Sequence, residues 1–156
     1  MVECTLTRDN CGKAIYSALL SFFFIQERNE NIRTLNDIIR NLKKDGLSFS
    51  MYIPWFFFIN PFWYTYHKNL IAKKNIEPLK KQKNGVMLHY VTCNQLYGIQ
   101  DSWCHFVCEI YDSGKRINFI DPYKKHIVID YPKHKTTKID FESFLSSNHI
   151  MLYIYR

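Results

Sequence analysis

Residues 8–15 read Arg8-Asp9-Asn10-Cys11-Gly12-Lys13-Ala14-Ile15. This stretch places a cysteine where polar, turn-forming residues give way to a helical pattern. Asp9 and Asn10 are residue types that commonly cap helix N-termini. Apolar residues then recur at intervals of one, three and four: Ala14, Ile15, Ala18, Leu19, Phe22 and Phe23. Because this spacing forms one broad apolar face, it predicts a buried helix that begins near Cys11.

A cysteine at a helix N-terminus is well placed to act as a nucleophile. The free N–H groups and the positive end of the helix dipole favour the thiolate over the thiol. Unpaired cysteines are, however, also common as buried and unreactive core residues. This stretch alone leaves both interpretations of Cys11 open.

The composition predicts one globular domain that spans residues 1–156. A chain of this length can bury a substantial core, and 47% hydrophobic with 17% aromatic residues excludes a disordered protein. The formal net charge of +7 would suit an acidic partner. The basic residues nevertheless lie in short, dispersed groups at 73–74, 80–83 and 133–135, without interleaved aromatic residues. We therefore expect a solvated basic surface and no specific nucleic-acid partner.

Cysteine usage and hydropathy predict a cytoplasmic protein. Five irregularly spaced cysteines do not form the even set of a secreted disulfide framework, and the polar residues 2–10 do not resemble a secretory signal. The longest apolar stretch, 53–66, is interrupted by Pro54, Asn60 and Pro61 and is too short to span a bilayer. We expect no transmembrane segment.

The first half of the chain is predicted to be mainly helical. Thr34 with Asp37 is a capping pair for a second helix over 34–44, and Gly46 is a natural stop after it. Residues 48–53 are a short extended candidate, residues 64–73 a helical one, and a lysine-rich connector ends at residues 84–85.

The second half reads mainly as strands, predicted over 86–93, 105–111, 117–120, 126–130 and 150–155. A tight turn over 112–115 joins two of them, and 140–147 is predicted to be a short helix. Helices followed by an antiparallel sheet predict an α+β fold. We expect a mainly helical half over 1–85, a mainly sheet half over 86–156, and a cleft where they meet.

Two residues in the second half complete a catalytic set with Cys11. His105 opens one strand and Asp121 ends the next, and pairing about the 112–115 turn brings them near each other. A carboxylate can then orient an imidazole, which in turn activates a thiol. Cys11, His105 and Asp121 thus fit the roles of nucleophile, general base and orienting group.

Four motifs carry a resemblance to a known family. They are Asn10-Cys11-Gly12 with Ala14, the helix 34–44 ending in Asp45-Gly46-Leu47, His105-Phe106-Val107 opening a strand, and Asp121-Pro122 ending the next. The chain resembles the papain-like peptidases that remove double-glycine leaders from bacteriocins and form N-terminal domains of ABC exporters.

This resemblance implies a papain-like fold in which the helix carrying the nucleophile packs on the sheet. It also implies the triad Cys11, His105 and Asp121, an acyl-enzyme mechanism without a cofactor, and a peptide or protein substrate. A transporter is the partner that the family suggests.

The chain departs from the family beside the nucleophile. The family has Asp directly before its cysteine, where this chain has Asn10, and its oxyanion-hole Gln corresponds to Thr5. The oxyanion hole is then expected to combine the Cys11 backbone N–H with a donor from Asn10 or Thr5.

Two alternative functions share this fold. Bacterial toxins and effectors with the same Cys-His-Asp order deamidate or transglutaminate proteins, act inside the cytoplasm of a target cell, and have immunity proteins as partners. A non-catalytic relative of the leader peptidases only binds peptide.

Other conspicuous residues receive simpler interpretations. Trp55, Trp63 and Trp103 are predicted to line the substrate cleft. Cys93, Cys104, His105 and Cys108 with His89 lack the paired spacing of a zinc site, so we expect no metal. Cys108 is expected in the core, and His126, His134 and His149 at the surface.

Overall fold

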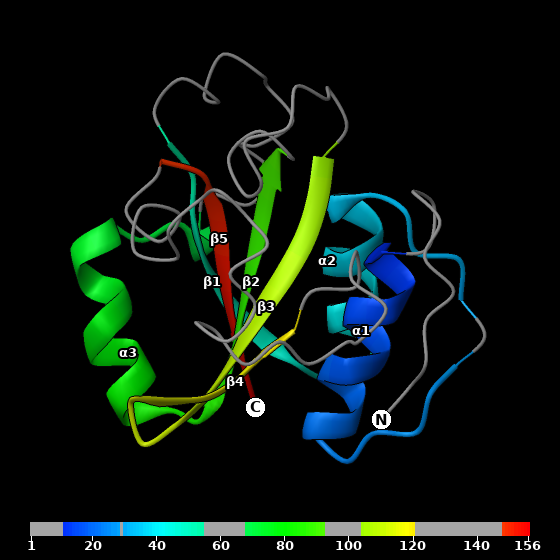
Figure 1. The fold of residues 1–156 in the computed structure, drawn as a ribbon, viewed down its shortest axis with the longest axis horizontal. Helices are drawn as coiled ribbons and strands as arrows, with labels where there is room; N and C mark the ends of the chain where they lie inside the picture. The colour runs from blue at the N-terminus through cyan, green and yellow to red at the C-terminus, as the bar shows by residue number, and fades with distance from the viewer. Residues whose placement is uncertain (1–10, 29, 55–67, 93–103, 121–147) are drawn as a thin grey trace, which may run out of the picture.

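The computed structural model of the chain describes residues 11–28, 30–54, 68–92, 104–120 and 148–156 (Figure 1). Two helices come first, α1 (Cys11–Phe22) and α2 (Leu35–Lys44), followed by strand β1 (Ser48–Tyr52). A 3₁₀ turn η3 (Lys73–Asn75) leads into helix α3 (Ile76–Gln82). The other strands are β2 (Gly85–Thr92), β3 (Cys104–Asp112), β4 (Lys115–Ile120) and β5 (Ile150–Tyr155).

The strands form one antiparallel sheet in the order β1-β5-β2-β3-β4. The predicted α+β class is therefore confirmed. The predicted strand 150–155 has the observed bounds, and the other strands within the described residues agree to within two residues. The sheet also draws on the first half of the chain, because β1 pairs with β5 from Ser48↔Tyr155 to Tyr52↔Met151.

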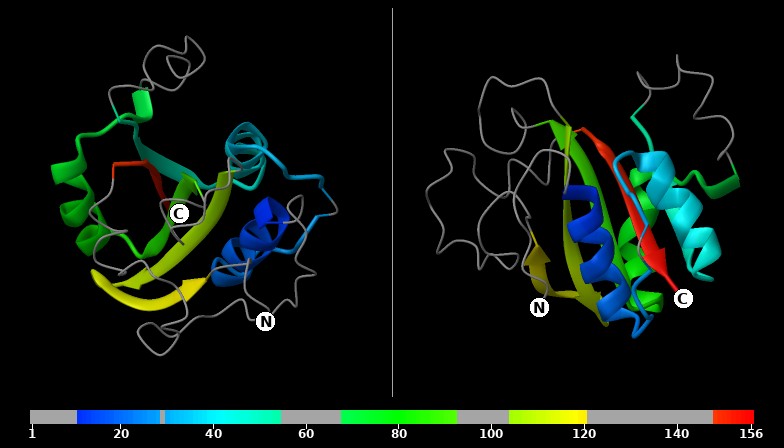
Figure 2. Two further views of the ribbon diagram at one scale, coloured as in Figure 1. Left: turned by 45° about the horizontal axis from the view of Figure 1, so that its top comes forward. Right: turned by 90° about the vertical axis from the view of Figure 1, so that its right-hand side faces the viewer.

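Helices cover both faces of the sheet (Figures 1 and 2). Successive strand residues point to opposite faces, so Val86 and Leu88 of β2 join the core shared with α1 and α2. Met87, between them, joins a smaller cluster with Ile76 of α3. The central strand β2 is thus covered on both faces, which explains why it reads as an apolar run that is interrupted by His89.

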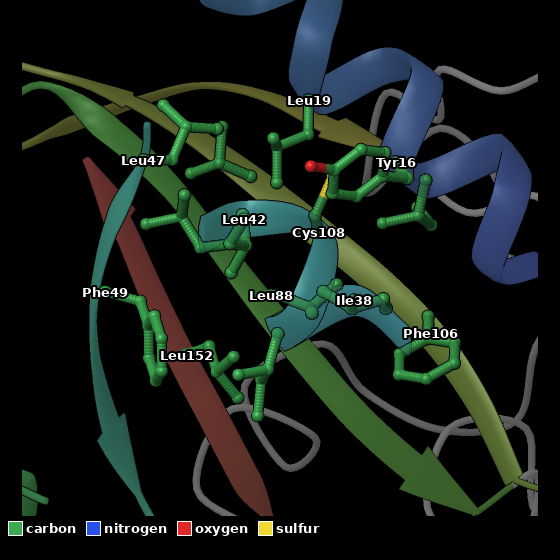
Figure 3. Close-up of a cluster of buried hydrophobic side chains, with 14 of the residues drawn as sticks. Tyr16, Leu19, Ile38, Leu42, Leu47, Phe49, Leu88, Phe106, Cys108 and Leu152 are labelled. Carbon is green, nitrogen blue, oxygen red and sulfur yellow. The ribbon is translucent and has the colours of Figure 1, made fainter. Parts of the chain in front are cut away.

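The larger core fills the space between the sheet and helices α1 and α2 (Figure 3). Leu19 of α1, Leu42 of α2 and Leu88 of β2 are each 1% exposed or less. Cys108 lies in the same cluster, as predicted. Burial raises the pKa of its thiol, and the negative charge of Glu109 raises it by a smaller amount. Burial of a leucine-sized side chain contributes about 1.5–3 kcal/mol, so this cluster is the main source of stability on this face.

Helix α2 begins and ends as its sequence predicts. The Thr34 hydroxyl accepts a hydrogen bond from the Asp37 N–H, and the Asp37 carboxylate accepts one from the Thr34 N–H. At the other end Gly46 adopts a φ of 71°, the left-handed conformation that terminates a helix without strain when the residue is glycine.

A partly buried ion pair connects α1, α2 and the segment between them. The Arg28 guanidinium donates to both carboxylate oxygens of Asp45, at 3.0 and 2.9 Å, and to the Asn41 side chain at 3.0 Å. Tyr16 of α1 donates to the same carboxylate. Although burial raises the pKa of Asp45, the hydrogen bonds from Arg28 and Tyr16 outweigh it and hold that pKa below its usual range.

The lysine-rich connector was interpreted incorrectly, because it contains helix α3. Ile76 is buried and Leu79 partly buried against the sheet, at the three-residue spacing of one helical face. The lysines between and after them masked this short pattern. The predicted strand 126–130, the predicted helix 140–147 and residues 64–67 of the helical candidate 64–73 lie outside the described residues. The rest of that candidate, 68–73, contains no α-helix, and Leu70 pairs with Met51 in an isolated parallel bridge.

Across the described ranges, none of the helices combines the length and the apolar character needed to cross a membrane.

The start of α1 should tolerate no side chain at Gly12. A Cβ atom there would lie 2.8 Å from the backbone carbonyl oxygen of Ile32. Gly12→Ala should therefore lower the free energy of unfolding by about 1–3 kcal/mol, despite alanine's better helix propensity. Urea denaturation measures this, with Ser21→Ala, at an exposed position of the same helix, as the control. An unchanged or more stable Gly12→Ala protein would contradict the close packing.

Candidate functional site

The backbone places the predicted nucleophile and base positions at the same end of the sheet. Helix α1 begins at Cys11 and runs beside β3 in the same direction, so the two elements start at the same end of the molecule (Figures 1 and 2). His105 is the second residue of β3 and pairs with Val91 of β2. The structure describes the backbone of Cys11 and His105 but not their side chains.

The hairpin that was predicted to carry the base and the orienting group is present. Ser113 and Gly114 have φ values of 52° and 79°, as in the tight turns that suit antiparallel hairpins. The last pair at the open end of β3 and β4 is Cys108↔Ile120, three residues from His105. Asp121, the next residue of the chain, lies outside the described residues, as do Thr5, Asn10, Trp55, Trp63 and Trp103.

A second group of polar side chains is buried on the α3 face of the sheet. His89 of β2 lies between Glu109 of β3 and His149, the residue before β5. Its Nε2 is 2.7 Å from Glu109 Oε2, and its Nδ1 is 2.7 Å from His149 Nε2. All three residues are 1% exposed.

Hydrogen-bond chemistry fixes the donor at one of these two contacts. An ionised carboxylate only accepts, so His89 donates its Nε2–H to Glu109. Which nitrogen donates between His89 Nδ1 and His149 Nε2 depends on the tautomers of the two rings. The row therefore links His149 through His89 to Glu109 by two hydrogen bonds.

Positive groups and hydrogen bonds keep Glu109 ionised. Burial alone raises its pKa, but the hydrogen bond from His89 and the charges of His89, Lys80 and Arg116 outweigh burial and lower the pKa below its usual value of 4.5. Arg116 Nη1 of β4 approaches the other carboxylate oxygen at 3.5 Å. Burial, followed by the charge of Glu109 and a hydrogen bond with it, raises the pKa of Tyr111.

Lys80 extends this cluster from the α3 side. Its side chain is 9% exposed, its Nζ donates to Glu77 Oε1 at 2.8 Å, and it lies 4.2 Å from the centre of the Tyr111 ring. The prediction that residues 80–83 lie on a solvated surface is therefore wrong for Lys80. The contact with an aromatic ring stabilises a cation that is largely removed from water.

The prediction that His149 lies at the surface is also wrong. His149 precedes the apolar strand β5, and its buried imidazole is hydrogen-bonded to His89. Its burial depends on a partner distant in sequence, so no local pattern indicates it. Glu109 did carry a signal, because a carboxylate amid the apolar residues of a central strand has to be buried with partners.

The cluster borders a cavity of about 200 Å³ between α3 and the sheet. Its walls include apolar Ile76, Met87 and Met151 and polar Lys80, His89 and Glu109. Among the described residues, no three His, Cys, Asp or Glu side chains are grouped in a way that could hold a metal ion. Three members of the zinc set considered above are not covered by this statement. Cys93 lies outside the described residues, and only the backbone of Cys104 and His105 is described.

No family model, curated protein or solved structure matches the chain. The resemblance to leader peptidases rests on the motifs around Cys11, His105 and Asp121. The fold class and the buried polar cluster rest on the structure itself.

Glu109 should make the stability of the protein dependent on acidic pH. Its pKa is lower in the folded than in the unfolded chain, so its contribution is fully present above about pH 4.5 and is lost as the pH falls through the folded-state value. Glu109→Gln should be less stable than wild type at pH 7 by about 1–3 kcal/mol, because His89 loses a charged acceptor. The difference between the two proteins should shrink as the pH falls below about 4.5.

Urea denaturation between pH 3 and pH 7, at about one-unit steps, measures both effects. Asp112→Asn, which removes a carboxylate from an exposed residue that does not line the cavity, controls for the loss of one negative charge. A stability difference that stays constant across this range would contradict an ionised Glu109.

Proposed function

We propose that the protein is a papain-like cysteine hydrolase in which Cys11, His105 and Asp121 form the catalytic triad. The thiolate of Cys11 attacks a carbonyl carbon of the substrate and forms a thioester, and the amine that leaves takes a proton from His105. His105 then takes a proton from water, which attacks the thioester, releases the acid and restores the thiol. Asp121 holds the imidazole in the tautomer that these steps require.

The observation that carries this proposal is that helix α1 and strand β3 begin at the same end of the molecule. Helix α1 begins with Cys11 and packs beside the strand whose second residue is His105. Backbone N–H groups and the dipole of a buried helix favour a thiolate at that end. The β3 residues that join the α1–α2 core are Phe106, Cys108 and Ile110, so the proposal requires that the start of β3 departs from this alternation and turns His105 toward Cys11.

Gly12 supports the same arrangement. The carbonyl oxygen of Ile32 lies 2.8 Å from the position that a Cβ atom at residue 12 would take, so the start of α1 packs closely against the α1–α2 connection. A nucleophile needs such a rigid base, because small displacements from the attack geometry are costly in rate.

The oxyanion of the tetrahedral intermediate is assigned to the Cys11 backbone N–H and to a donor from Asn10 or Thr5. Trp55, Trp63 and Trp103 are proposed to bind apolar side chains of a peptide or protein substrate. The enzyme would act in the cytoplasm, with a transporter as partner for a leader peptidase.

Thr5, in place of the family's Gln, suits an alternative with the same chemistry as well as it suits a leader peptidase, and it favours the non-catalytic binding module. A deamidase or transglutaminase forms the same thioester from a glutamine side chain and releases ammonia. As a toxin or effector, such an enzyme would act in the cytoplasm of a target cell and would be held inactive by an immunity protein. A peptide-binding module without catalysis is the remaining alternative.

Alkylation of the native protein tests the thiolate. Cys11 should react with iodoacetamide near neutral pH faster than the other four cysteines, and His105→Ala should slow it about tenfold or more. Cys108 should stay unlabelled because it is fully buried. Peptide mapping by mass spectrometry follows every cysteine in one experiment.

His134→Ala provides a matched histidine control for this experiment and should leave the labelling of Cys11 unchanged. If Cys11 reacts no faster than Cys4, or if His105→Ala has no effect, the protein is not a cysteine hydrolase of this type and the binding module is favoured.

Incubation with protein mixtures distinguishes the reactions. Wild type and Cys11→Ala are compared by mass spectrometry of the mixture before and after incubation. New peptide termini made only by wild type indicate a peptidase, as proposed, because only hydrolysis of the main chain creates them. Conversion of Gln to Glu without new termini would contradict the peptidase and indicate the deamidase.

A further inference from the structure

The cavity beneath α3 has the properties of a small ligand site. Its volume of about 200 Å³ far exceeds the roughly 10–15 Å³ that one water molecule needs. Helices α3 and α1 lie on opposite faces of the sheet (Figure 2). Because residues of α3 line the cavity, a ligand there is separate from the chemistry proposed for Cys11.

Hydrogen-bond donors exceed acceptors in this cavity. The carboxylate of Glu109 is already occupied by His89, Arg116 and Tyr111. Lys80, by contrast, has one hydrogen-bond acceptor among the described residues, the Glu77 carboxylate, for three N–H bonds. An ammonium buried to this degree requires further oxygen atoms, and the cavity is where they can be supplied.

Charge in the cavity points to an anion. Lys73 lies at the cavity as a second cation, with its Nζ 6.0 Å from the centre of the Tyr52 ring. Glu109 also lines the cavity, and its negative charge is offset by Arg116, which pairs with it from outside the lining. Glu77 opposes Lys73 and Lys80, but its side chain is 68% exposed, so it can turn to solvent when another carboxylate takes its place on Lys80.

The opposite wall of the cavity is apolar and adaptable. Met87 and Met151 contribute flexible thioether side chains, and Ile76 closes the wall from α3. An apolar wall favours a ligand whose anionic group carries a hydrocarbon chain over a bare inorganic anion.

We propose that this cavity binds a small carboxylate with a short apolar chain. The carboxylate accepts hydrogen bonds from Lys80 and displaces Glu77, while the chain lies against Met87 and Met151. Lys73 adds attraction at the cavity edge.

Methionine methyl NMR on the full chain tests this, with butyrate as the probe. The chain has four methionines, and two of them, Met87 and Met151, line the cavity. Butyrate should shift both methyl signals in a saturable way and leave Met51, which is buried in the α1–α2 core, unchanged. Butylammonium, of similar size and opposite charge, should bind at least about tenfold more weakly.

Two substitutions with opposite expected effects complete the test. Lys80→Gln should weaken butyrate binding about tenfold or more, whereas Lys81→Gln, the same change at the exposed neighbouring residue, should not. Glu77→Gln should strengthen binding, because it removes the carboxylate that competes for Lys80. An unchanged Met51 signal verifies that each variant is folded.

The proposal is overturned if butyrate shifts neither Met87 nor Met151 in wild type. Equal binding of butyrate by wild type and a folded Lys80→Gln protein would also overturn it, as would equal binding of butyrate and butylammonium. A stronger response to inorganic phosphate than to butyrate would show that the apolar wall plays no part and would contradict the stated ligand class.

Discussion

Strand β2 hydrogen-bonds along most of its length to β5 on one side and to β3 on the other. This double pairing removes β2 from the edge of the sheet and buries it between helices on both faces. Alternate residues of β2 must then fit the α1–α2 face, and the residues between them must fit the α3 face. Val86 and Leu88 satisfy the α1–α2 face, and Met87 and His89 satisfy the α3 face.

The two faces solve this requirement by different means. The α1–α2 face is an apolar core, and its helices are positioned by the Arg28–Asp45 ion pair and by the caps of α2. The α3 face includes a buried carboxylate, Glu109. Removing that charge from water costs several kcal/mol unless partners compensate it, and His89 and Arg116 do so from neighbouring strands. Short helix α3 adds Lys80 to the same cluster, so charge as well as apolar contact holds it to the sheet.

Sequence patterns predicted the elements that depend on local chemistry. The spacing of apolar residues indicated α1, the pair Thr34 and Asp37 indicated where α2 starts, and Ser113-Gly114 indicated the β3–β4 turn. The patterns did not predict contacts between distant segments. Helix α3 is only seven residues long and carries several lysines, and the burial of Lys80 and His149 depends on Tyr111 and His89, which lie elsewhere in the chain. The triad was predicted from residue types and their order in the sequence. The structure adds that α1 and β3, which contain Cys11 and His105, begin at the same end of the molecule.

The central claim is that Cys11 and His105 act together at that end. A helix N-terminus and a strand start can lie close while their side chains point apart, and only contact between the two groups would activate the thiol. The most direct measurement is a crystal structure of the reduced protein in which both side chains are resolved. We predict a distance from Cys11 Sγ to the nearer ring nitrogen of His105 of about 3–4 Å, within hydrogen-bond reach. A distance beyond about 6 Å, with the thiol and the imidazole on opposite faces of the sheet, would contradict the catalytic pair.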